Sequence, residues 1–120
     1  MVSAAVLQEM TRRLVAQFDP EQVILFGSHA WGTPDRGSDV DLMVIVRNSA
    51  LSDYQRAVLA HHCLRGLPVP KDIVVRTRAE YDFYRQARAS LERRVAEQGK
   101  VLYERPQARA GEELARQSAA

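Results

Sequence analysis

Residues 26–46 read FGSHAWGTPDRGSDVDLMVIV, and this stretch decides the fold. A short block of β-branched and aromatic residues over 21–26 leads into this stretch and stops at Gly27. It predicts a buried strand that ends there. At its other end, the run from Leu42 to Val46 is apolar on both faces of a pleat, so it predicts a central strand over 39–47 with both faces covered. The segment between the two strands holds the residues that could bind a ligand or take part in catalysis.

Gly27 and Ser28 stand where the first strand ends and a short helical turn could begin. Glycine permits a backbone that a phosphate can approach closely, and the Ser28 hydroxyl can cap the turn. Free N–H groups at the start of a helical turn carry partial positive charge and attract anions. The pair therefore predicts a phosphate site, with a plain turn glycine at Gly27 as the alternative.

Ten residues separate Ser28 from Asp39, and Asp39 and Asp41 stand two apart at the start of the second strand. Residues i and i+2 of a strand point to the same face, so the two carboxylates project side by side. They repel each other unless a cation neutralises them, and carboxylate oxygens suit Mg²⁺. Asp72, which opens a third apolar block, could supply one more carboxylate for metal-assisted phosphoryl or nucleotidyl transfer. The alternative for all three is a solvated side chain at a strand edge.

Outside this stretch, apolar spacing predicts the remaining elements of one small α/β domain. They are helices over about 3–17, 52–65 and 79–98, a strand over 72–76 and a short edge strand over 101–103.

The composition excludes several classes of protein. The 120 residues are 46% hydrophobic with a single cysteine, Cys63, so neither a disulfide network nor a cysteine-rich zinc site is possible. The longest apolar run has five residues, far fewer than the roughly 20 that cross a bilayer. The N-terminus lacks the apolar region of a secretory signal, so we expect a cytoplasmic protein without a membrane anchor.

The net charge of +2 conceals a gradient along the chain. Four Lys or Arg stand against six Asp or Glu over 1–51, and eleven stand against seven over 52–105. This suits an anionic ligand or an acidic partner surface but is too small to indicate nucleic-acid binding. Four arginines of the last predicted helix form either a solvated basic face, which we favour, or a contact surface for a partner or RNA: Arg85, Arg88, Arg93 and Arg94.

At these residues the sequence resembles the minimal nucleotidyltransferases, small members of the DNA polymerase β-like nucleotidyltransferase superfamily. Their signature is a strand, then Gly-Ser, ten residues, Asp-x-Asp leading into a second strand, and a later acidic residue in a hydrophobic strand. Gly27, Ser28, Asp39 and Asp41 match it with the spacing unchanged, and Asp72 in KDIVV matches the third carboxylate.

The resemblance covers roughly residues 1–104 and implies a small mixed β-sheet flanked by helices, the polymerase β-like palm fold. It implies that residues 1–105 form the nucleotidyltransferase domain, and we expect residues 106–120 to form a frayed tail. Members often carry arginines in the turn after Gly-Ser, where this chain has His29 and Trp31. Trp31 could stack on a base or cover the edge of the core.

By the same resemblance, Asp39, Asp41 and Asp72 are the catalytic and metal-binding carboxylates, with two Mg²⁺ ions expected and Asp72 near or acting as general base. Gly27 and Ser28 would bind the triphosphate of ATP. The implied reaction is transfer of AMP to a hydroxyl of a partner, a small helical HEPN-type toxin encoded nearby. This makes the chain an antitoxin, and the alternative is an inactive antitoxin that neutralises by binding.

Overall fold

The computed structural model describes residues 2–35 and 37–106. The helices are α1 (Ala4–Phe18), α2 (Ser28–Trp31), α3 (Asp53–Cys63), α4 (Arg78–Tyr84) and α5 (Leu91–Gln98). The strands are β1 (Gln22–Phe26), β2 (Val40–Val46), β3 (Lys71–Thr77) and β4 (Lys100–Glu104).

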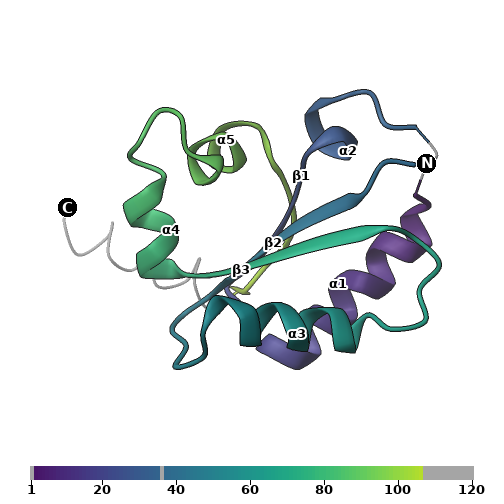
Figure 1. Ribbon diagram of the computed structural model, residues 1–120, viewed down its shortest axis with the longest axis horizontal. Coiled ribbons are helices and arrows are strands. Elements are labelled where there is room, and N and C mark those ends of the chain that lie inside the picture. The colour runs from purple at the N-terminus through teal and green to yellow at the C-terminus, as the bar shows by residue number, and fades with distance from the viewer. Residues whose placement is uncertain (1, 36, 107–120) are drawn as a thin grey trace.

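The four strands form one mixed sheet in the order β3-β2-β1-β4 (Figure 1). β1 pairs antiparallel with both β2 and β4, and β2 pairs parallel with β3. The predictions of a central strand at 39–47 and an edge strand at 101–103 are confirmed. The mixed sheet between helices also confirms the predicted fold class.

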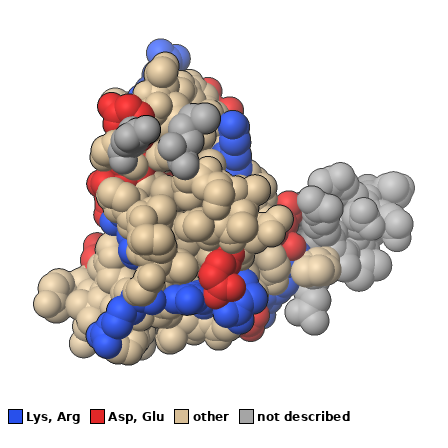
Figure 2. Space-filling view, turned by 90° about the vertical axis from the view of Figure 1, so that its right-hand side faces the viewer, with Lys and Arg blue, Asp and Glu red and all other residues tan. Residues whose placement is uncertain are grey.

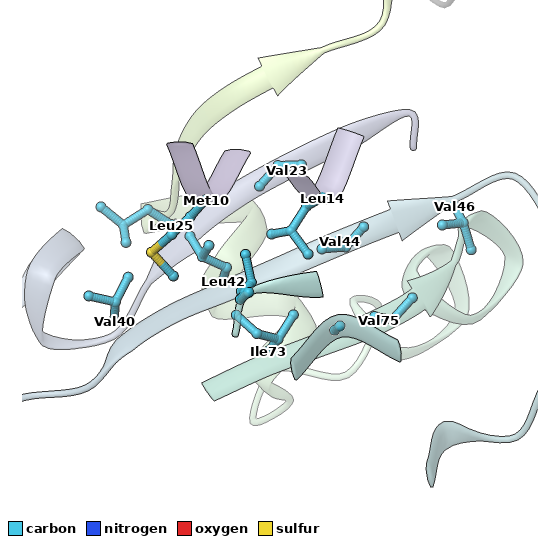
Figure 3. Close-up of a cluster of buried hydrophobic side chains, with 12 residues drawn as sticks. Met10, Leu14, Val23, Leu25, Val40, Leu42, Val44, Val46, Ile73 and Val75 are labelled. Atoms are coloured by element: carbon cyan, nitrogen blue, oxygen red, sulfur yellow. The ribbon is translucent and has the colours of Figure 1, made fainter. Parts of the chain in front are cut away.

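One face of the sheet is covered by α1 and α3, which lie below it in Figure 1. Met10 and Leu14 of α1 and Ala60 of α3 are fully buried there against alternate residues of β1, β2 and β3. Figure 3 shows this cluster, with Leu42 and Val44 of the central strand at its middle. Helix α1 begins where the Ser3 hydroxyl accepts a hydrogen bond from the Val6 N–H, close to its predicted start.

The other face of the sheet carries α2, α4 and α5 (Figure 1). A second cluster of buried residues lies here and joins the sheet to α4 and α5: Ile24, Phe26, Met43, Ile45, Tyr81 and Val95. Gly99 caps the end of α5 and lies close to β1. A Cβ at this position would lie 2.7 Å from Ile24 Cγ2, so a larger residue would not fit without a shift. These contacts hold α5 over the end of β1 that leads into α2.

The single helix predicted over 79–98 is wrong, because the chain forms two helices with a break after Tyr84. The Ser90 hydroxyl accepts from the Arg93 N–H at 3.0 Å and caps a new helix. The sequence spacing predicts that Tyr84 and Leu91 lie on one apolar stripe of a single helix. In the structure they are 49% and 39% exposed. The break allows Tyr81 and Val95 to contact the sheet from two separate helices.

The predicted tail after residue 106 lies outside the described residues, so the proposed domain limit at 105 stays a prediction. Within 2–35 and 37–106, no helix has the length and apolar character needed to cross a membrane.

Candidate active site

The sheet pairing brings the predicted site residues to one end of the sheet. Phe26, the last residue of β1, is the antiparallel partner of Asp41 near the start of β2. Asp41 is in turn the parallel partner of Asp72 near the start of β3. Two carboxylates on neighbouring strands therefore lie beside the turn that follows β1, which contains Gly27 and Ser28.

The carboxylates share the face of the sheet that α1 and α3 leave uncovered. Side chains alternate along a strand, so Asp41 points to the same face as Met43 and Ile45, whose side chains belong to the second cluster. Asp39 lies two residues before Asp41, just ahead of β2. Asp72 is exposed, so the site is open to solvent and to a ligand.

The surroundings of Asp41 disfavour its negative charge. Burial raises the pKa of Asp41 above its ordinary value, the negative charges of Asp72 and Asp39 raise it further, and His29 partly offsets them. Asp41 therefore lies close enough to both Asp72 and Asp39 to be repelled by their charges. A cation bound among them would relieve this repulsion.

The three carboxylates fit Mg²⁺ in chemistry but are not closed around a metal. Oxygen donors on adjacent strands are the ligands that Mg²⁺ takes, together with water and substrate phosphates. Yet in the described part of the chain no group of three or more His, Cys, Asp or Glu side chains is arranged to hold a metal ion. A bound metal would therefore draw part of its coordination from substrate or water, as is usual for Mg²⁺.

Gly27 is required by its contact with Asp41. Its φ is +74°, in the region that favours glycine, and a Cβ here would overlap Asp41 Oδ2 and lie 3.0 Å from Asp41 Cγ. The chain therefore needs glycine at this position to turn away from β1 while the Asp41 carboxylate packs against it. No local pattern in the sequence indicates this contact, because the two residues belong to different segments of the sheet.

Ser28 does not cap the turn, so that prediction is wrong. It is the first residue of α2, and the capping position is held by Gly27, without a side-chain hydrogen bond. The N–H groups of Ala30 and Trp31 donate to the Gly27 carbonyl at 2.9 and 3.0 Å. The N–H groups of Ser28 and His29 have no such acceptor among the described residues, so they can still bind a ligand.

His29 and Trp31 have separate structural roles. His29 Nε2 lies 3.3 Å from the Ser38 carbonyl, which can only accept, so this nitrogen carries the proton. Trp31 packs against Phe26 with ring centroids 6.2 Å apart and covers the edge of the second cluster. Of the two alternatives for Trp31, the structure shows the one in which the ring covers the edge of the core. The guanidinium carbon of Arg94, in α5, lies over the ring, 4.4 Å from its centroid.

The basic side chains of the other sheet face do not neutralise the carboxylates. Figure 2 views the end of the molecule where β2 and β3 begin, and a row of Lys and Arg runs across its lower part, in the layer of α1 and α3. In this layer Arg12 and Arg13 bind Glu9 at 2.6 and 2.7 Å. The sheet separates these cations from Asp41.

The sequence over residues 8–108 matches the family described as polymerase beta, nucleotidyltransferase. The chain belongs to this family. The match includes the Gly-Ser turn and all three carboxylates of the candidate site. The nucleotidyltransferase resemblance found in the sequence is thus confirmed, and the roles of the individual residues remain predictions.

Two solved structures share the fold of this nucleotidyltransferase. A candidate nucleotidyltransferase from Sulfolobus solfataricus is 19% identical, with a TM-score of 0.60 over 84% of this chain and 79% of that chain. A toxin-antitoxin complex solved with AMP-PNP contains a chain that is 27% identical, with a TM-score of 0.63 over 84% of this chain and 75% of that chain. No curated protein matches the sequence.

Arg94 contacts the helix that follows the Gly27–Ser28 turn, and the sequence does not distinguish it from the other arginines near the C-terminal end of the domain. Helical spacing groups it with Arg85, Arg88 and Arg93 as a solvated basic face and does not say which of them meets another element. In the structure Arg85 pairs with Asp82 at 3.2 Å and Arg93 with Glu97 at 2.8 Å. Only contacts between segments far apart in the sequence distinguish Arg94 from them.

Proposed function

We propose that this chain is a Mg²⁺-dependent nucleotidyltransferase that transfers AMP from ATP to a hydroxyl group of a partner protein. The observation that carries the proposal is the strand register, in which Asp41 faces Phe26 on one side and Asp72 on the other. This register gives a carboxylate cluster next to a turn with two available N–H groups. Family membership supports the reaction class, and a relative solved with AMP-PNP supports an adenine nucleotide.

In the proposed reaction the acceptor hydroxyl oxygen bonds to the α-phosphorus of ATP. The bond from this phosphorus to the oxygen that bridges it to the β-phosphate breaks, and pyrophosphate leaves. The hydroxyl proton passes to a carboxylate, for which Asp72 is the candidate because it is exposed beside Asp41. The N–H groups of Ser28 and His29 would bind phosphate oxygens and orient the triphosphate.

Mg²⁺ held by Asp39, Asp41 and Asp72 would neutralise the phosphates and stabilise the charge that develops in an in-line displacement. The negative charges of Asp72 and Asp39 near Asp41 would favour a cation at this site over an anion. Gly27 allows the Asp41 carboxylate to approach the turn, so that the metal ligands and the phosphate donors lie next to each other.

The acceptor in this proposal is a small helical HEPN-type toxin, which would make the chain an antitoxin. The support is the 27% identity to a chain of a toxin-antitoxin complex. The described domain also has few elements beyond the sheet and the helices that cover it, so a partner would have to present the acceptor hydroxyl itself.

The test is incubation of the full chain with α-labelled ATP, Mg²⁺ and the helical protein encoded beside it. We expect label on the partner, and loss of the label with Asp41→Asn and Asp39→Asn. Glu97→Gln is the matched control, because it removes an exposed carboxylate that pairs only with Arg93 among the described residues. Absence of label with the wild type, or equal labelling by the Asp41 variant, would contradict transfer.

A second function is neutralisation of the toxin by binding alone, and one observation favours it: no described carboxylate group is closed around a metal. Under this function the double variant Asp39→Ala, Asp41→Ala protects cells from the toxin as well as the wild type. ATP with Mg²⁺ would then leave the melting temperature of the chain unchanged.

A further inference from the structure

Arg94 and Trp31 form a pair that joins α5 to the turn of the candidate site. The Arg94 guanidinium carbon lies over the Trp31 ring, 4.4 Å from its centroid, in a cation–π contact. The other face of the ring is held from within, because Trp31 packs against Phe26 and the second cluster. The ring is therefore a fixed platform for the guanidinium.

Trp31 lies in the same short helix as the N–H groups that we expect to bind phosphate. Trp31 follows Ser28 by three residues in α2, and residues three apart are neighbours on a helix surface. α5 is fixed in the same region, since Val95 is buried against the sheet and Gly99 contacts β1. The Arg94 guanidinium is thus held on Trp31, the last residue of the short helix that begins with the available N–H groups of Ser28 and His29.

The charge of Arg94 is not neutralised within the described part of the chain. Arg76, Arg78, Arg85 and Arg93 each lie within 4.0 Å of a carboxylate, whereas no described carboxylate pairs with Arg94. A guanidinium carries five N–H donors, and no described acceptor is hydrogen-bonded to those of Arg94, so they can donate to a ligand. Arg94 is exposed, and a ligand can reach it.

We propose that Arg94, held on the Trp31 ring, binds the phosphate groups of a nucleoside triphosphate at the Gly27–Ser28 turn. This rests on the proposed function, because it takes the nucleotide to enter there. A triphosphate next to Asp39, Asp41 and Asp72 meets a negative surface, and Arg94 supplies a positive group from outside the turn. Arginine suits this task because its planar fork binds phosphate through two parallel hydrogen bonds.

The test measures binding of three probes to the full chain: ATP with Mg²⁺, inorganic tripolyphosphate, and adenosine. Calorimetry gives the affinities. Trp31 is the single tryptophan of the chain, so its fluorescence reports directly on the proposed site. The variants are Arg94→Ala and Arg94→Lys, with Arg93→Ala as the matched control, which removes the same charge from the neighbouring position on α5.

Arg94→Ala should weaken binding of ATP and of tripolyphosphate by about tenfold or more and leave adenosine binding unchanged. Arg94→Lys should fall between the alanine variant and the wild type, since lysine keeps the charge without the planar fork. Arg93→Ala should stay within about twofold of the wild type. Trp31 emission should shift in Arg94→Ala but not in Arg93→Ala.

Unchanged polyphosphate affinity in Arg94→Ala, or an equal loss for adenosine or for Arg93→Ala, would overturn the inference. A wild-type chain that binds no polyphosphate would overturn it together with nucleotide binding. A chain that binds ATP through Arg94 but labels no partner would overturn the proposed transfer reaction and leave the inference standing.

Discussion

The Asp41 carboxylate occupies the space that a side chain at position 27 would need. A Cβ on Gly27 would overlap Asp41 Oδ2 and stand 3.0 Å from its Cγ. The turn after β1 and the carboxylate of β2 are therefore fitted to each other. A change at either residue should affect both the stability of the fold and the candidate site.

Gly27→Ala should lower the free energy of unfolding by at least about 2 kcal/mol, because it combines an unfavourable positive φ with the clash against Asp41. Gly66→Ala is the matched control. Its φ is +90°, and a Cβ added there would have no atom within 4 Å, so it should cost only about 1 kcal/mol. Urea denaturation of both variants measures the difference.

The clash can be isolated by removing the other partner. Asp41→Ala in the Gly27→Ala background deletes the two nearest atoms and should recover the part of the loss that exceeds Gly66→Ala. Asp41→Ala alone is the reference, because loss of this charge has its own effect on stability. If Gly27→Ala costs as much in the Asp41→Ala background as in the wild type, the loss comes from backbone strain alone.

Asp41→Asn should raise the stability of the metal-free protein by about 0.5 kcal/mol or less, because solvent screens a partly exposed charge, while it abolishes transfer. The amide removes one of three neighbouring negative charges in a partly buried position. Added Mg²⁺ should raise the melting temperature of the wild type and raise that of Asp41→Asn less. Thermal unfolding with and without Mg²⁺ measures both effects, and a destabilised Asp41→Asn would mean that the carboxylate is not under repulsive strain.

Glu80→Gln should destabilise the fold at neutral pH by about 1 kcal/mol or less, with a loss that shrinks in acid. Arg56 is 5% exposed and donates to Glu80 at 2.8 Å, and this hydrogen bond holds the pKa of Glu80 below its ordinary 4.5. Because the pKa is lower in the folded state, the stabilisation is complete above about pH 4.5 and is lost as the pH falls through the folded value.

Glutamine can still cap α4 as the third residue of the capping box, so this variant removes only the charge. The measurement is the difference in unfolding free energy between wild type and Glu80→Gln from pH 3 to 7, about the range where a carboxyl titrates. A difference that does not vary with pH would show that the ion pair contributes nothing.

Val44→Ala and Val101→Ala delete the same atoms at the centre and at the edge of the sheet. Val44 is fully buried in β2, and its truncation should cost about 2 kcal/mol or more. Val101 is 51% exposed in β4, and its truncation should change stability by less than about 0.5 kcal/mol. Similar losses for the two variants would contradict the assignment of β2 as the central strand.

Most of the fold could be predicted from the sequence because its signals are local. The apolar run from Leu42 to Val46 has both faces covered, as its composition indicates. Ser52 begins α3 with a hydroxyl that accepts from the Gln55 N–H, as a cap should. The break between α4 and α5 could not be predicted in this way, because apolar spacing continues across it and only packing against the sheet separates the two helices.

The candidate site divides in the same way. Gly27, Ser28, Asp39 and Asp41 lie within one stretch of chain, so the sequence shows that they are close along it. The alternation of side chains in β2 also gives the face of Asp41, which is the face of Met43 and Ile45. Asp72 stands out by its place at the start of an apolar block. Its pairing opposite Asp41 depends on the register of two parallel strands, which no local pattern specifies.

The sequence alone therefore determined the family, the order of the strands along the chain and the carboxylates that open β2, because each depends on residues close together in the chain. The tertiary structure decided why position 27 must be glycine and which arginine contacts Trp31. The first depends on the contact of Gly27 with Asp41, and the second on α5 lying over Trp31. Both are contacts between segments that only the packed sheet and its helices bring together.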